Sequence, residues 1–194
     1  MNVQPPLMTN LSKKVCLLGD FAVGKTSLVR RFVYDLFADK YISTIGVKVS
    51  RKTVTVRRAD EIVELTIMLW DLASREEFDR VRASYLRGSA GAVLVCDLTR
   101  PETLDSVQLY AQELHAISPD AHLIVAANKR DLLEPSPETE QVQAAAAHLG
   151  APYYLTSAKT GDGVEALFRR LASCWWTGSF RNRTWIRPRP STFS

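Results

Sequence analysis

The chain has 194 residues, of which 46% are hydrophobic and 24% are charged. This length and balance predict one globular domain with a sizeable core, rather than two small domains. Four of the 25 basic residues lie in residues 175–194, a stretch without acids, and the other 21 equal the 21 acidic residues, so the net charge of +4 arises in a tail. A basic tail is weak grounds for nucleic-acid binding, and we expect no specific nucleic-acid partner.

The cysteine content and hydropathy indicate a cytoplasmic protein. The three cysteines, Cys16, Cys96 and Cys174, are odd in number, and two lie in apolar runs where a thiol behaves as a small hydrophobe, which suits a reducing compartment. No apolar run approaches the roughly 20 residues that span a bilayer. The first ten residues also lack the basic-then-apolar pattern of a signal sequence.

Short β-type runs alternate with helical stretches along the chain. Strands are predicted at 13–19, 47–58, 61–70, 90–98, 122–129 and 152–158. Helices are predicted at 25–37, 75–87, 103–117, 137–150 and 163–176. This alternation predicts an α/β fold, a mostly parallel six-stranded sheet with helices on both faces. The second and third strands are too close in sequence for a crossover, so we expect them to form the one antiparallel pair.

A glycine-containing loop, GDFAVGKT at residues 19–26, lies between the first predicted strand and the first predicted helix. In such a loop the backbone N–H groups wrap phosphates, the lysine reaches the β- and γ-phosphates, and the hydroxyl binds Mg²⁺. A glycine turn that only caps a helix is the alternative, and the position between strand and helix weakens it. The predicted phosphate-binding residues are Phe21, Ala22, Val23, Gly24, Lys25, Thr26 and Ser27.

Two polar strings, NKRD at residues 128–131 and TSAK at 156–159, follow later predicted strands. Either string alone is an ordinary loop, but ligands of open α/β sheets bind at the carboxyl ends of the strands. The carboxylate of Asp131 can accept hydrogen bonds from the ring N–H and the exocyclic amine of guanine, whereas adenine would leave that charge unpaired. This favours GTP over ATP. The predicted base-binding residues are Asn128, Lys129, Asp131, Ser157, Ala158 and Lys159.

With these motifs the chain resembles the small GTPases of the Ras superfamily, which are P-loop NTPases, and most closely their Rab branch. The resemblance covers about residues 13–174 and also rests on YISTIGV, LWD with EEF, and YLRGSAGAVLVCDLT. It implies GTP/GDP and Mg²⁺ as cofactors, with Phe37 edge-on against the guanine and Tyr41 near the phosphates. It also implies that Thr26, Thr44 and Asp71 hold the Mg²⁺. Phe37 could instead be a packing residue, and Asp71 a helix cap.

Three positions depart from the family pattern, and all would surround the γ-phosphate. The family has Asp-x-x-Gly-Gln where this chain has Asp71, Ser74 and Arg75. The family glutamine orients the attacking water, and arginine lacks its neutral carbonyl. Ser74 restricts a backbone that must change conformation, and the ring of Phe21 would crowd the γ-phosphate and the path of an inserted arginine.

The departures imply a GTPase with slow or partner-dependent hydrolysis, for which Lys25 and Arg75 are the catalytic candidates. Arg75 could act as a brake or, alternatively, as an arginine that stabilises the developing charge in cis. The rival function is a GTP-loaded binding scaffold that does not turn over. A P-loop ATPase or kinase is disfavoured by NKRD and by the lack of a second, lid-like domain.

Two segments, 38–48 and 71–86, are expected to change order with the γ-phosphate and to bind effectors and regulators. Within them Phe78 and Tyr85, with the neighbouring Trp70, resemble an effector-binding apolar patch, although Trp70 and Phe78 could simply pack beneath it. We expect a monomer.

The predicted layout is a flexible N-terminus at 1–12, the GTPase domain at 13–176 and a basic, flexible tail at 177–194. Cys174 lies 20 residues from the end, which disfavours prenylation, and Asn2 disfavours myristoylation. The tail could keep the protein soluble, bind a protein groove, or make peripheral contact with an anionic membrane without a lipid anchor.

Overall fold

The protein is described here by a computed structural model, which covers residues 10–37, 44, 46–58, 61–73, 79–133 and 139–177. The strands are β1 (Asn10–Leu18), β2 (Val47–Arg58), β3 (Glu61–Leu72), β4 (Gly91–Asp97), β5 (His122–Asn128) and β6 (Tyr153–Leu155). The helices are α1 (Lys25–Tyr34), α2 (Asp79–Leu86), α3 (Glu102–Ile117), α4 (Glu140–His148) and α5 (Val164–Thr177), and Arg130–Leu132 form a 3₁₀ turn.

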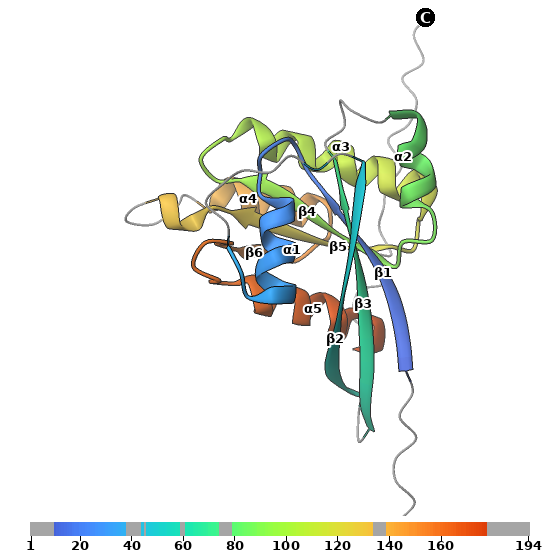
Figure 1. Ribbon diagram of the computed structural model, residues 1–194. Coiled ribbons are helices and arrows are strands. Elements are labelled where there is room, and N and C mark those ends of the chain that lie inside the picture. Colours follow the sequence, from blue (N-terminus) through green and yellow to red (C-terminus); the bar gives the residue numbers. More distant parts are fainter. Residues whose placement is uncertain are drawn as a thin grey trace, which may run out of the picture.

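The six strands form one sheet in the order β2-β3-β1-β4-β5-β6, shown in Figure 1. Neighbouring strands are parallel except for β2 and β3, which pair as an antiparallel hairpin. Helices α1 and α5 cover one face, and α2, α3 and α4 cover the other. The predicted α/β class, the mostly parallel sheet and its single antiparallel pair are therefore confirmed.

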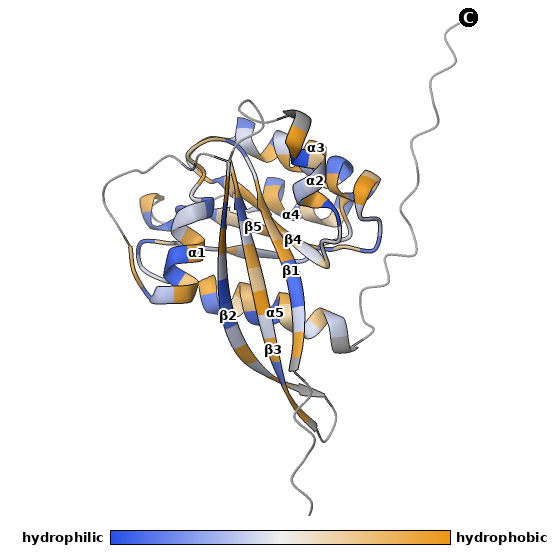
Figure 2. Ribbon diagram, turned by 45° about the vertical axis from the view of Figure 1, so that its right-hand side comes forward, coloured by the Kyte–Doolittle hydropathy of each residue, from blue (hydrophilic) through white to orange (hydrophobic). Residues whose placement is uncertain are grey.

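The core has two halves because side chains alternate across the central strands. Along β1, Val15 and Leu17 face α1 and α5, whereas Cys16 and Leu18 face α3 and α4. Strand β4 is buried along its whole length, as expected for a central parallel strand covered on both sides. Figure 2 shows the largely apolar colouring of β3 beside the more polar edge strand β2.

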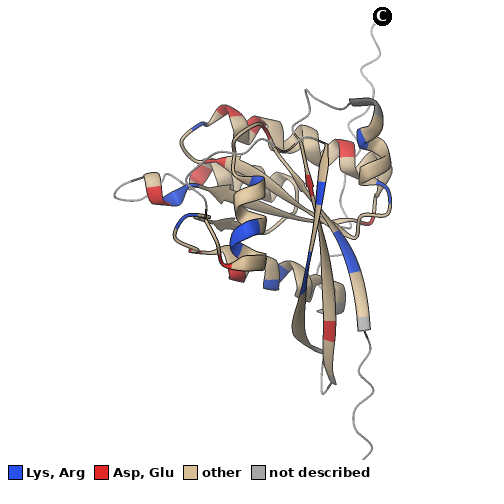
Figure 3. Cartoon of the chain, viewed as in Figure 1, with Lys and Arg blue, Asp and Glu red and all other residues tan. Residues whose placement is uncertain are grey.

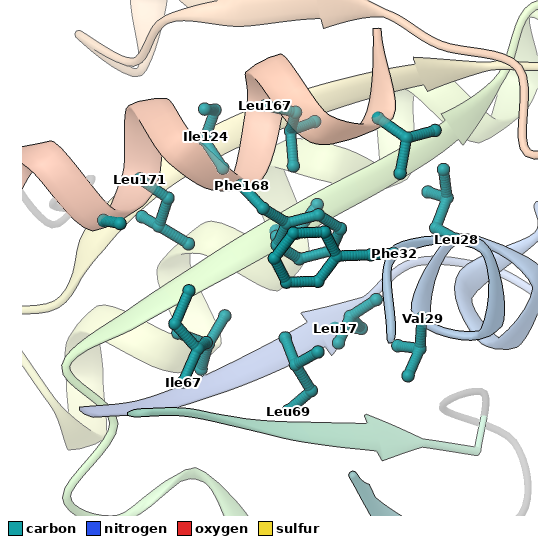
Figure 4. Packing of buried hydrophobic residues seen from close by; sticks show 14 of the residues in the cluster. Leu17, Leu28, Val29, Phe32, Ile67, Leu69, Ile124, Leu167, Phe168 and Leu171 are labelled. Atoms are coloured by element: carbon teal, nitrogen blue, oxygen red, sulfur yellow. The ribbon is translucent and has the colours of Figure 1, made fainter. Parts of the chain in front are cut away.

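The α1–α5 half is anchored by two stacked aromatic rings. The ring centroids of Phe32 of α1 and Phe168 of α5 lie 4.1 Å apart, with an angle of 18° between the ring planes (Figure 4). Both rings are almost completely buried. Burying a ring of this size stabilises the fold by about 1.5–3 kcal/mol, so this contact fixes α1, and with it the loop that precedes α1, against the sheet.

Several predicted boundaries differ from the observed ones; the strand predicted at 152–158, for example, is observed at Tyr153–Leu155. Residues 10–12, predicted as flexible, belong to β1 and pair with residues 64–66 of β3, because the long β2–β3 hairpin extends the edge available to β1. Helix α1 ends at Tyr34 rather than at 37, because Asp35 adopts a left-handed conformation that stops the helix. The first four residues of the helix predicted at 75–87 lie outside the described residues.

The surface is mixed in charge. In the view of Figure 3, basic residues occur on α1, β1, β2 and α5, and acidic residues occur on the surrounding helices and loops. All three cysteines are buried and free. Within the described part of the chain, none of the helices is both long and apolar enough to cross a bilayer.

Candidate functional site

Many of the predicted site residues that the structure describes gather at the carboxyl ends of the parallel strands. The loop at 19–24 follows β1, Asp71 lies near the end of β3, and Asn128 ends β5. The loop that begins at Thr156 follows β6. This edge is where an open α/β sheet offers a crevice for a ligand.

The loop before α1 is shaped by close backbone contacts. A Cβ at Gly24, which has φ +104°, would lie 2.2 Å from Nδ2 of Asn128, so only glycine fits there. The ammonium of Lys25 donates to the carbonyls of Gly19 and Asp20, at 2.7 and 2.8 Å. Lys25 therefore lies inside the curve of the loop, at the N-terminus of α1, where backbone N–H groups and the helix dipole attract an anion.

Three side-chain oxygens converge beside this loop. The hydroxyl of Thr26 donates to Oδ2 of Asp71 at 2.5 Å and lies 2.8 Å from the hydroxyl of Thr44, which also donates to Oδ2 at 3.3 Å. Burial raises the pKa of Asp71, although the hydrogen bond from Thr26 and the charge of Lys25 oppose this effect. The other oxygen, Oδ1, is buried and has no hydrogen-bond partner among the described residues.

This oxygen set fits a hard divalent cation. Hydroxyl and carboxylate oxygens are the ligands that Mg²⁺ prefers, and Mg²⁺ is usually held by few protein groups. A buried carboxylate oxygen without a partner costs free energy that a cation would recover. Thr26, Thr44 and Asp71 could therefore hold Mg²⁺, as the sequence predicts.

Asn128 joins the three loops of the site. Its amide nitrogen donates to the carbonyl of Val23 at 2.9 Å, and its amide oxygen accepts from the hydroxyl of Thr156 and the N–H of Ala158, each at 3.2 Å. The hydroxyl of Ser157 donates to Asp131 at 2.5 Å. The two polar strings and the phosphate loop are thus one hydrogen-bonded unit.

Several residues of this unit are absent from the sequence prediction. Arg31 of α1 donates to the carbonyls of Ala158 and Lys159, at 2.9 and 2.5 Å, and fixes that loop against the helix. Asp97, at the end of β4, lies 2.6 Å from the ammonium of Lys129. A signal for Asp97 was present, because it ends an apolar strand just as Asp71 does. Arg31 had no comparable signal.

The electrostatics of Asp97 differ from those of Asp71. Burial alone would raise the pKa of Asp97, but hydrogen bonds from Lys129, Thr99 and Arg100 outweigh it and hold that pKa below its ordinary value. Asp97 therefore stays ionised, because nearby cations and hydrogen-bond donors balance its charge. For Asp71, the hydrogen bonds and nearby charges do not outweigh the effect of burial on the pKa.

Two of the other predicted residues are exposed, two are partly buried, and several more lie outside the described residues. Phe21 is 49% exposed and Phe37 is 37% exposed, so neither is a core residue. Trp70 and Tyr85 are partly buried against the α3–α4 half of the core, with ring centroids 6.3 Å apart. This geometry supports the packing interpretation of Trp70. Tyr41, Ser74, Arg75, Phe78 and the tail from 178 onward lie outside the described residues.

Comparison with known proteins places these features in a family. A family model described as "Ras family" matches residues 14–175. GTP-binding protein ypt5 of Schizosaccharomyces pombe is 34% identical over 174 residues, which are 88% of this chain and 81% of that protein. Ras-related protein SEC4 of Saccharomyces cerevisiae is 34% identical, covering 82% and 73% of the two chains. Ras-related protein RABD1 of Arabidopsis thaliana is 36% identical, covering 82% and 77%.

Proposed function

The chain belongs to the Ras superfamily of small GTPases and is Rab-like, and we propose that it binds GTP and GDP with Mg²⁺ but hydrolyses GTP slowly or only with a partner. The observation that carries this proposal is the side chain of Asn128, which links the phosphate loop to the base-binding loop. A site for a phosphate chain and a site for a base are thereby held at a fixed separation.

In this function the phosphate loop, residues 21–26, wraps the phosphates with its backbone N–H groups, and Lys25 and Ser27 support it. Thr26, Thr44 and Asp71 hold Mg²⁺, which when bound neutralises charge on the phosphates. Tyr41 completes the phosphate side, and Phe37 packs against the edge of the base. The exposed position of Phe37 is compatible with such a contact.

Asp131 selects guanine, with Asn128, Lys129, Ser157, Ala158 and Lys159 around the base. Its carboxylate accepts a hydrogen bond from Ser157, which keeps the acid oriented before a base arrives. A guanine base presents two donors to such an acid, and an adenine base presents none in that geometry. We therefore expect GTP and GDP to be bound far more tightly than ATP and ADP.

The impairment of hydrolysis rests on Phe21, Ser74 and Arg75. Phe21 projects from the phosphate loop with about half of its surface exposed, so its ring is available to crowd a γ-phosphate and an approaching arginine. Arg75 lacks the carbonyl that orients water. The same three residues support a second candidate function, a binding scaffold that remains loaded with GTP.

We further propose that the protein acts in the cytoplasm as a monomer that regulates a trafficking or signalling step through effectors. The segments 38–48 and 71–86 would form the effector surface, because Thr44 and Asp71, one from each segment, lie beside Thr26 of the phosphate loop. The three buried free thiols suit a reducing compartment.

A calorimetric titration with GDP and with ADP, each in Mg²⁺, tests the binding function, after the bound nucleotide has been removed from the purified chain by chelating Mg²⁺ and gel filtration. We expect heat of binding with GDP only. A Lys25→Met variant should lose GDP binding, and a Lys14→Met variant, changed at a lysine away from the loop, should keep it. Equal binding of ADP and GDP, or retention of GDP by Lys25→Met, would contradict the proposal.

A further inference from the structure

Asp97 is a buried acid that belongs to neither nucleotide motif. Its side chain is fully shielded from solvent, and both carboxylate oxygens are occupied. Oδ1 accepts hydrogen bonds from the backbone N–H and the hydroxyl of Thr99, at 3.0 and 2.7 Å. Oδ2 lies 2.6 Å from the ammonium of Lys129 and 2.9 Å from Nε of Arg100. One buried carboxylate therefore holds two cations in fixed positions.

Lys129, the first of these cations, has an uncommon backbone conformation. It adopts φ 67° and ψ 33°, in the left-handed region that residues with a side chain rarely enter. The contact with Asp97 holds the side chain of Lys129 in place. The backbone N–H of the next residue, Arg130, donates to the carbonyl of Thr156 at 3.0 Å. The base-binding loop is thus anchored to the end of β4.

Arg100, the second cation, reaches the phosphate loop. Its Nη2 donates to the carbonyl of Phe21 at 2.7 Å, across 79 residues of sequence. A guanidinium is rigid and planar, so its Nε and Nη2 atoms have a fixed separation. Because Nε contacts Asp97 and Nη2 contacts the carbonyl of Phe21, the guanidinium fixes the distance between Asp97 and that carbonyl. The turn that carries Arg100 is itself fixed, since the N–H of Asp97 donates to the hydroxyl of Thr103 at 2.9 Å.

We propose that Arg100 is a positioning residue that couples the phosphate loop to the base-binding Lys129 through Asp97. The inference rests on the proposed guanine-nucleotide function and names what keeps the two halves of that site in register. Outward movement of the phosphate loop breaks the contact between Arg100 and Phe21. The contact therefore opposes the opening through which a bound nucleotide leaves.

The test measures the release of a fluorescent GDP analogue from the full chain, chased with excess GDP in Mg²⁺. Arg100→Gln should release the analogue about tenfold faster, which corresponds to ~1.4 kcal/mol. Arg100→Lys should release the analogue at a similarly raised rate, because a single ammonium does not reproduce the fixed pair of nitrogens that contact Asp97 and Phe21. Arg169→Gln is the matched control and should release at the wild-type rate, since the side chain of Arg169 forms an exposed ion pair with Glu165 on α5, away from the site.

A spectroscopic measurement separates positioning from a general loss of stability. In ³¹P NMR of the bound GDP, the β-phosphate resonance should shift in Arg100→Gln and not in Arg169→Gln, because the phosphate loop moves only in the former. Faster release without such a shift, or full rescue by Arg100→Lys, would mean that Arg100 only stabilises the fold and would overturn the inference.

The wild type distinguishes failure of the inference from failure of the proposed function. A wild-type chain that binds no guanine nucleotide overturns both. A wild-type chain that binds GDP, with Arg100→Gln releasing it at the same rate, overturns the coupling role alone.

Discussion

The base side and the γ-phosphate side of this site differ in how far the polypeptide satisfies its own polar groups. On the base side, both ends of the Asn128 amide, the carboxylate of Asp131 and both oxygens of Asp97 have partners within the chain. On the other side, Asp71 keeps a buried oxygen without a described partner. The polar groups of the base side are therefore paired before a ligand arrives, whereas Asp71 on the γ-phosphate side keeps an oxygen that a ligand could pair.

The two sides also differ in sequence. The base strings NKRD and TSAK fit the family pattern, while Phe21, Ser74 and Arg75 depart from it. Under the proposed function, this difference in sequence would suit the protein to holding GTP rather than to hydrolysing it. Changes on the base side should therefore alter which nucleotide is bound, and changes on the γ-phosphate side should alter turnover.

The largest effect is expected for Asp131→Asn on the base side. The amide cannot accept both guanine hydrogen bonds, so GDP affinity should fall roughly 10²–10³-fold, because a charged partner is lost in a buried contact. Competition against a fluorescent GDP analogue measures this, with Asp162→Asn as an exposed control. Because an amide can donate to a carbonyl, the variant should gain affinity for xanthosine diphosphate. Unchanged base preference would refute the role of Asp131.

A stability change of similar size is expected where α2 meets α3, next to the γ-phosphate side. Nε of Arg82 lies 2.8 Å from Glu113, and the side chain of Arg82 is only 5% exposed. Its Nη1 also donates to the carbonyl of Ala73, two residues after Asp71. Arg82→Ala should lower the free energy of unfolding by about 3 kcal/mol, because it leaves Glu113 without its counter-charge.

Urea unfolding of the Arg82→Ala variant measures that loss. The control is Arg169→Ala, whose ion pair with Glu165 is exposed and should be worth less than about 1 kcal/mol. Equal losses of unfolding free energy in the two variants would show that the ion pair of Arg82 with Glu113 is worth no more than an exposed pair.

A smaller effect is expected for Arg75→Gln on the γ-phosphate side. Restoring a neutral carbonyl should speed single-turnover GTP hydrolysis about tenfold, or ~1.4 kcal/mol in the barrier. Arg75→Ala should leave the rate unchanged, as should Arg87→Gln, a control at an exposed arginine. If both Arg75 variants slow hydrolysis, Arg75 assists the reaction and the interpretation as a brake is wrong.

The smallest effect concerns pH on the base side. The folded-state pKa of Asp97 lies below the ordinary value of 3.8, so its stabilising contribution is complete above that value and is lost as pH falls through the lower folded pKa. The difference in unfolding free energy between wild type and Asp97→Asn should therefore be constant near neutrality and shrink below about pH 4. Urea titrations at several pH values measure it, with Asp35→Asn as the control. A difference that grows in acid would contradict the assignment.

Local pattern was enough to predict the sheet, its antiparallel pair and the loop between β1 and α1. Strand β4 reads as a continuous apolar run, and Gly24 and Lys25 stand at the junction of a strand and a helix. Such signals are contained within a few neighbouring residues.

What the sequence did not predict depends on contacts between distant segments. The strand pairing of residues 10–12 requires the edge that β3 presents. The contacts of Arg31 with Ala158 and of Arg100 with Phe21 join residues 127 and 79 positions apart. No local periodicity encodes such a pair, although the acid that ends β4 was a usable hint of a buried charge.

In the proposed function, nucleotide binding is intact while GTP hydrolysis is impaired. The most direct test extracts the nucleotide from the purified protein, identifies it by chromatography, and then follows single-turnover GTP hydrolysis in Mg²⁺. We expect bound GTP that persists for hours. Bound GDP together with hydrolysis complete within minutes would contradict it, because Ser74 and Arg75 would then belong to a working catalytic site.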